Sequence, residues 1–165
     1  MPYPLVGPTS VELVVSRRWP TRDALCVDVR NYAIKNQRDV AGDGVEIPWD
    51  HWNDIVEDKW AHIIDAIADP AKRPATWDYP LASTEKFDNI VRVEVITHYH
   101  YTGLDIRLWS KRKGEEHYTP QKEGVRIDGR AVQKLLLLHR EKLLPDRLYY
   151  INTRGAHQGQ GPERW

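Results

Sequence analysis

The sequence reads Val27-Asp28-Val29-Arg30-Asn31-Tyr32 and later repeats the same pattern as Leu104-Asp105-Ile106-Arg107-Leu108-Trp109. In both stretches Asp, Arg and an aromatic residue occupy every second position. The positions between them are apolar, except for Asn31. Side chains of a β-strand point alternately to opposite faces, so a period of two indicates a strand. Each stretch therefore places Asp, Arg and the aromatic residue on one strand face, and the repetition predicts two copies of one unit.

Two further segments recur in the same order around this pattern. Downstream, Gly44-Val45-Glu46-Ile47 resembles Gly124-Val125-Arg126-Ile127. Upstream, Val11–Val15 aligns with Val91–Val95. Three recurring segments in one order strengthen the prediction of an internal repeat.

After each Gly-Val-x-Ile strand, the spacing of apolar residues changes to three and four, which is typical of a helix. The first predicted helix begins beside Pro48 and ends near Asp69, before Pro70. Its apolar stripe consists of Trp49, Trp52, Val56, Trp60, Ile63 and Ile67. We expect the three tryptophans of this helix to lie in the core.

The second predicted helix has Asp128 as its N-cap and ends before Pro145. Its apolar stripe, which His139 interrupts, consists of Val132, Leu135, Leu136 and Leu143. The sequence thus predicts an α+β protein of two tandem units, each with three or four strands and a C-terminal helix.

The predicted boundaries follow from these patterns. Residues 9–69 form the first unit and residues 89–144 the second. Residues 70–88 are rich in proline and form the linker. Residues 145–165 form a polar, glycine-rich tail, in which Leu148–Ile151 is a candidate for a short docking strand.

Composition indicates a folded, intracellular protein. The chain has 165 residues, of which 41% are hydrophobic, with seven Trp and eight Tyr. The single cysteine, Cys26, forms no internal disulfide, which favours a reducing compartment: cytoplasm, nucleoid, or host cytoplasm for a viral protein. No apolar run is long enough to cross a bilayer and the first residues do not resemble a secretory signal, so we expect no membrane association.

Charge is unevenly distributed although the net charge is zero. Residues 1–88 contain ten Lys/Arg and fifteen Asp/Glu, whereas residues 89–165 contain fourteen and nine. A basic half suits a polyanionic partner, but an acidic helix and random scatter account for the asymmetry equally well.

The second copy resembles the positive cofactor four family of transcriptional coactivators. The matching elements are Gly103–Trp109 and the segment Tyr118–Ile127, which contains Thr119-Pro120-Gln121-Lys122-Glu123-Gly124. The resemblance covers roughly residues 90–144. In residues 11–69 only Arg30 and Gly44–Trp49 match, and Asp39–Asp43 replaces the Thr-Pro-x-Lys element.

This resemblance implies a curved, four-stranded antiparallel sheet with a C-terminal helix in each unit. It also implies that the two units pair through their helices as an internal pseudo-dimer, whose sheets bind single-stranded nucleic acid. The expected function is single-stranded DNA binding in transcription regulation or replication, with little sequence preference. RNA polymerase or other transcription proteins are the expected partners.

Single-strand binding requires cations for phosphates and flat side chains for bases. In the second copy we expect these contacts from Arg107, Trp109, Lys111, Arg112, Lys113, Tyr118, Lys122, Arg126, His98, Tyr99, His100 and Tyr101. In the first copy we expect them from Arg17, Arg18, Trp19, Arg30, Tyr32, Lys35 and Arg38. The opposite strand face, with Val27, Val29, Leu104, Ile106 and Leu108, is assigned to the core.

Several alternatives stay open. The Asp28–Arg30 and Asp105–Arg107 pairs also fit simple ion pairs on one strand face. His98, His100 and His117 could share a metal, although solvated or stacking roles suit them better. No catalytic set and no cofactor motif is recognisable, so the expected protein is not an enzyme. RNA binding, a protein-interaction module that has lost nucleic-acid binding, and a homo-oligomer formed through sheet edges remain alternatives.

Overall fold

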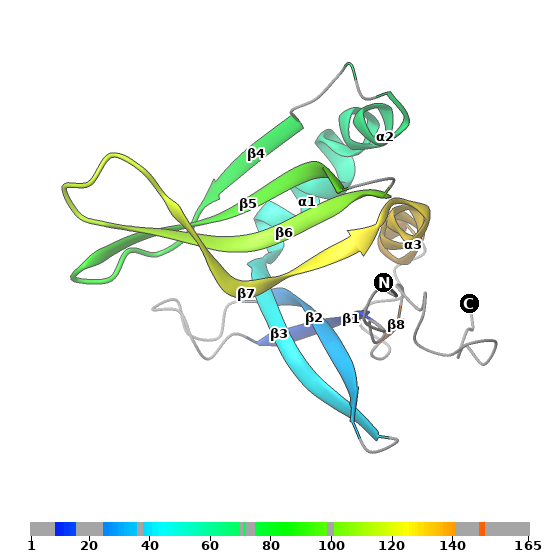
Figure 1. Ribbon diagram of the computed structural model, residues 1–165, viewed down its shortest axis with the longest axis horizontal. Helices are drawn as coiled ribbons and strands as arrows, with labels where there is room; N and C mark the ends of the chain where they lie inside the picture. The colour runs from blue at the N-terminus through cyan, green and yellow to red at the C-terminus, as the bar shows by residue number, and fades with distance from the viewer. Residues whose placement is uncertain are drawn as a thin grey trace.

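Two antiparallel sheets and a few helices make up the part of the chain that the computed structural model describes (Figure 1). The described residues are 9–15, 25–35, 38–69, 71, 75–98, 101–140 and 149–150. This architecture confirms the predicted α+β class. Among the described residues, no helix is long and apolar enough to cross a membrane.

The first sheet contains β1 (Thr9–Val15), β2 (Leu25–Lys35) and β3 (Arg38–Pro48). A two-residue strand, β8 (Tyr149–Tyr150), pairs with β1 and gives the order β3-β2-β1-β8. The short docking strand predicted within Leu148–Ile151 is therefore present at Tyr149–Tyr150, and its flanking residues lie outside the described ranges.

The second sheet contains β4 (Ala75–Pro80), β5 (Phe87–His98), β6 (Tyr101–Arg112) and β7 (Thr119–Asp128), in the order β4-β5-β6-β7. The expected linker, residues 70–88, thus holds a complete strand, β4. Its inward face consists of Ala75, Trp77 and Tyr79, an alternation too short to predict a strand between Pro74 and Pro80.

Helices follow β3 and β7, as the spacing of apolar residues predicts. The first helical segment comprises α1 (Trp49–Asn53), the π-helical turn η1 (Asp54–Asp58) and α2 (Trp60–Ala68). The second is α3 (Gly129–Arg140). Asp128 caps α3, because its Oδ1 accepts a hydrogen bond from the Arg130 N–H at 2.9 Å. The predicted end of this helix before Pro145 lies outside the described residues.

The strand register corrects one predicted alignment. Glu12 lies opposite Asp28 in the first sheet, and Glu94 lies opposite Asp105 in the second. Val11 therefore corresponds to Val93 and not to Val91. A shift by two residues leaves every side chain on the same face, so hydrophobic alternation alone cannot detect it.

Each sheet receives its fourth strand from the segment that follows a helix. β4 follows α2 and pairs with β5, and β8 follows α3 and pairs with β1. The two sheets consequently have the same strand arrangement. In the first sheet, however, the closing strand comes from the far end of the sequence.

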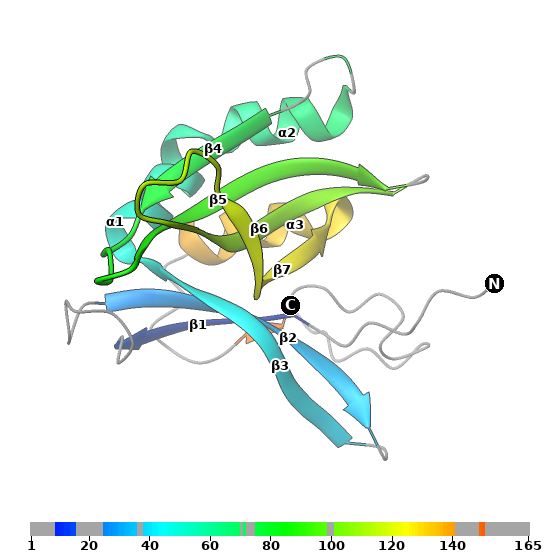
Figure 2. The ribbon, with the colours of Figure 1, turned by 60° about the vertical axis from the view of Figure 1, so that its left-hand side comes forward.

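A continuous core joins the two sheets. It contains Val27 and Val29 from the first sheet and Leu104 and Ile106 from the second, all buried as predicted. Strand β7 lies against β3, and Figure 2 shows the two sheets one above the other. Trp52 and Trp60 are also buried in this core, and Trp49 packs against it.

Candidate nucleic-acid interface

On the outer face of the second sheet, Arg107 is held by its own sheet. Its Nε and Nη2 atoms donate to the Asp105 carboxylate at 3.3 and 3.2 Å, and its Nη1 donates to the main-chain oxygens of Gln121 and Lys122 at 2.9 and 3.1 Å. The Asp105 side chain is only 6% exposed. The ion pair that the sequence left open as an alternative is present, and it engages an arginine predicted to bind nucleic acid.

Arg30 makes the equivalent contacts in the first sheet. Its Nε and Nη2 atoms donate to Asp28 at 3.3 and 3.0 Å, and its Nη1 donates to the Gly42 oxygen at 2.9 Å. In both sheets the arginine thus links its own strand to the next one. We call this arrangement the Arg–Asp latch.

A glycine makes each latch sterically feasible. Gly44 lies opposite Arg30 and Gly124 lies opposite Arg107. A Cβ atom at either glycine would lie 2.7–2.9 Å from backbone or side-chain atoms of the neighbouring strand, closer than real Cβ contacts allow. In both sheets the register shifts directly after the arginine, as expected for a β-bulge.

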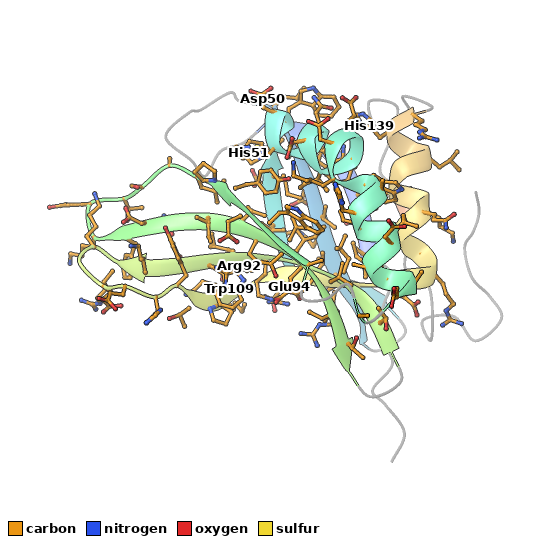
Figure 3. The ribbon with its side chains drawn as sticks, turned by 90° about the horizontal axis from the view of Figure 1, so that it is seen from above. Asp50, His51, Arg92, Glu94, Trp109 and His139 are labelled. Atoms are coloured by element: carbon orange, nitrogen blue, oxygen red, sulfur yellow. The ribbon has the colours of Figure 1, made fainter. Side chains whose placement is uncertain are left out.

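Trp109 is covered by Arg92, which is not among the predicted contact residues. The Arg92 Cζ atom lies 4.2 Å from the centre of the Trp109 ring system. Arg92 also forms a bidentate ion pair with Asp78 of β4, with Nε–Oδ1 at 2.7 Å and Nη2–Oδ2 at 3.1 Å. Figure 3 shows Arg92, Glu94 and Trp109 gathered on the second sheet. The sequence does not reveal this contact, because it depends on strand register. Asp78, Arg92 and Arg107 become neighbours only when β4, β5 and β6 pair.

Two more cation–aromatic pairs lie towards the hairpin end of the same sheet. The Lys111 Nζ atom lies 5.3 Å from the Tyr118 ring centre and donates to the Glu115 oxygen at 3.2 Å. The Arg112 Cζ atom lies 5.6 Å from the Phe87 ring centre. Arg112 and Phe87 are direct cross-strand partners on the opposite face of the sheet, because side chains alternate and Lys111 and Trp109 are on the outer face. The prediction that Arg112 shares a binding face with Arg107 and Trp109 is therefore wrong. In Figure 1 this end of the sheet projects away from α2 and α3.

We call the two pairs on the outer face the cation–aromatic row. They are Arg92–Trp109 and Lys111–Tyr118. Lys113 and Lys122 are exposed nearby. Gly114, whose φ of 94° suits glycine, makes the turn that carries Lys113.

Arg126 adds a further cation beside the latch. Its Nε lies 3.6 Å from the Asp105 carboxylate and its side chain is half exposed. The first sheet lacks these cations at equivalent register positions. Glu46 takes the place of Arg126, and Ser10 takes the place of Arg92. The outer face of the second sheet is therefore the better candidate for binding an anion.

For the other predicted contact residues, the structure does not describe the side chains. Tyr32, Lys35, Arg38, His98 and Tyr101 lie in strands, but only their backbones are described. The remaining predicted contacts lie outside the described residues, and they are Arg17, Arg18, Trp19, Tyr99 and His100.

His117 was considered as a metal ligand. It lies in an exposed loop, 4.0 Å from Glu116. Within the described ranges, no group of three or more His, Cys, Asp or Glu residues is arranged to hold a metal ion.

A polar cluster fixes β4, the strand that carries Asp78. The buried Tyr79 hydroxyl donates to Asp54 Oδ2 at 2.6 Å, and the Pro80 oxygen lies 2.7 Å from His51 Nε2. Burial, aided by the nearby Asp54 carboxylate, raises the pKa of Tyr79. The Tyr79 hydrogen bond lowers the pKa of Asp54, and a hydrogen bond shared with Asp54 raises the pKa of Asp58. The edge strand is thus anchored to the first helical segment.

Comparison of the chain with protein-family models, curated proteins and solved structures finds no match. The candidate interface consequently rests on its own geometry, and the likeness to the positive cofactor four family stays a prediction.

Proposed function

We propose that this protein binds single-stranded DNA, without catalysis, on the outer face of its second sheet. The observation that carries the proposal is the cation–aromatic row. Unpaired bases stack on aromatic rings and on guanidinium planes, while cations bind the phosphates. Each stacked base contributes on the order of 1–3 kcal/mol, largely independent of sequence.

In this proposal the protein is an intracellular, positive-cofactor-four-type factor in transcription or replication, with RNA polymerase or other transcription proteins as partners. Lys111, Lys113 and Lys122 capture the phosphate backbone. Arg107 has a supporting role, because its latch shapes the strand that carries Lys122.

The two units act as a pseudo-dimer of unequal halves in the same proposal. Their matching strand orders and the contact between His139 Nε2 and Glu57 Oε1, at 2.9 Å, support the pairing. Since Ser10 and Glu46 replace the cations in the first sheet, we expect one binding face per chain.

A second candidate function is a protein-interaction module. The observation in its favour is charge compensation, because Asp78 and Asp105 neutralise Arg92 and Arg107 on the proposed face. RNA as the ligand is a third candidate, since bases of RNA would stack equally well.

The test is fluorescence anisotropy with a labelled single-stranded oligothymidine at low and high salt. Duplex DNA and single-stranded RNA serve as competitors. We expect salt-sensitive binding that single-stranded DNA displaces better than duplex DNA, because counterion release makes phosphate binding weaken with salt. Absence of binding at low salt would favour the protein-interaction module, and stronger competition by RNA would reassign the ligand.

A further inference from the structure

Asp78 holds Arg92 in the geometry in which a guanidinium binds a phosphate. Two parallel N–H···O contacts, 2.7 and 3.1 Å long, join the Nε and Nη2 atoms to the two carboxylate oxygens. Arginine forms the same bidentate arrangement with phosphate oxygens. A carboxylate in this position therefore stands where a phosphodiester would bind.

The other side of Arg92 has the features of a base platform. Its guanidinium lies over the Trp109 ring at 4.2 Å, so the indole supports one face of the plane. The Arg92 and Asp78 side chains are 23% and 44% exposed, which leaves the pair accessible from solvent. Arginine planes of this kind stack on unpaired bases.

The strand carrying Asp78 is fixed in place. The two residues that follow Asp78 both contact the first helical segment: the Tyr79 hydroxyl donates to Asp54, and the Pro80 oxygen lies 2.7 Å from His51 Nε2. Asp78 is also the direct cross-strand partner of Arg92. The backbone of Asp78 is thereby held opposite Arg92, within reach of its guanidinium.

We infer that Arg92 is a phosphate-binding subsite for single-stranded nucleic acid, and that Asp78 occupies it as an intramolecular competitor in the free protein. The inference rests on the proposed function and adds that Asp78 lowers the affinity for single-stranded nucleic acid. A bound phosphate displaces Asp78 while Trp109 continues to support the guanidinium. Removing the negative charge at position 78 should then strengthen binding.

The experiment compares Asp78→Asn with Glu116→Gln, using the same labelled oligothymidine at low salt. Both substitutions remove one negative charge, but the Glu116 side chain is 89% exposed and lies 4.0 Å from His117. We expect Asp78→Asn to tighten binding about five-fold, the upper range for an exposed ion pair. Glu116→Gln should change it by less than about two-fold, because solvent and salt screen the charge of so exposed a side chain.

Arg92→Lys is the complementary variant, since a lysine retains the charge but not the bidentate fork. Combined with Asp78→Asn, it should abolish the gain in affinity. The Nε–H resonance of Arg92 gives a readout independent of affinity, and it should shift when oligothymidine is added to the wild-type protein.

The outcomes separate the two proposals. If the wild type binds but Asp78→Asn and Glu116→Gln have equal effects, the competitor role of Asp78 is contradicted and single-strand binding stands. If neither the wild type nor Asp78→Asn binds, the proposed function fails as well. An unmoved Arg92 resonance during wild-type binding would place the phosphate elsewhere.

Discussion

At the scale of single residues, an arginine lying across a glycine organises the outer face of each sheet. Arg30 and Arg107 each bind an aspartate on their own strand and main-chain oxygens on the next. The close approach leaves no room for a Cβ atom at Gly44 or Gly124.

Gly124→Ala tests this steric requirement. Its Cβ atom would lie 2.8 Å from the Cα and Cβ atoms of Arg107, so the strands must separate. We expect a loss of about 1–3 kcal/mol in the free energy of unfolding, as for other overpacked sites. Urea denaturation measures the free energy of unfolding. The control is Lys122→Ala on the same strand, which should change that free energy by no more than about 0.5 kcal/mol. Equal stabilities of the two variants would contradict the latch geometry.

The buried Tyr79 predicts a dependence of stability on alkaline pH. Its pKa is raised above the ordinary value of 10.0 by burial and by the bond to Asp54. The folded state thus keeps the proton that the unfolded state releases, so this contribution to stability is complete below pH 10 and declines above it. Urea unfolding at pH 8 and pH 11 should show a smaller decline for Tyr79→Phe than for the wild type. Identical declines would show that the hydroxyl is not protected.

The residues also show how far the sequence could predict the candidate site. Periodicity identified the strand with Arg107 and Trp109, because both lie on one strand in a period-two pattern. The roles of Arg92 and Asp78 were not predictable, because these residues come from two other strands and only the register brings them together. The sequence likewise allowed an ion pair for Arg107 but could not show that Gln121 and Lys122 take up its remaining donors.

At the scale of secondary-structure elements, the two helical segments are in direct contact. His139, which interrupts the apolar stripe of α3, lies 2.9 Å from Glu57 of η1, and its ring lies 6.0 Å from that of Trp49. The stripe and the Asp128 cap were predictable from spacing. The partner of His139 was not, because it lies in the other unit.

A double-mutant cycle with Glu57→Gln and His139→Gln measures this contact between units. We expect a coupling energy of about 0.5 kcal/mol near pH 6, small because the Glu57 side chain is 63% exposed. Urea unfolding of the four proteins gives the value. Strictly additive effects would mean that the two side chains do not stabilise the pairing of the helices.

At the scale of the whole molecule, the sheets are completed from the segments after the helices. β4 pairs with β5 along its whole length, from Ala75 to Pro80, whereas β8 pairs only with Ser10 and Val11. Closure of the first sheet by β8 therefore joins the two ends of the described chain.

Tyr150→Pro tests this closure, since proline removes the backbone N–H that an edge strand offers to its neighbour. We expect faster hydrogen exchange of amides in β1 and little change in β5. Tyr150→Ala, which retains the backbone N–H, is the control. Unchanged exchange in β1 would show that β8 contributes nothing to the first sheet.

The central claim is that single-stranded DNA binds the outer face of the second sheet, and photo-crosslinking tests it most directly. An oligonucleotide containing 5-bromodeoxyuridine is bound to the full chain, irradiated, and the modified peptides are identified by mass spectrometry. The account predicts crosslinks in the peptides that contain Trp109 and Tyr118, the aromatic residues of the cation–aromatic row. Crosslinks confined to residues 25–48 of the first sheet would contradict it.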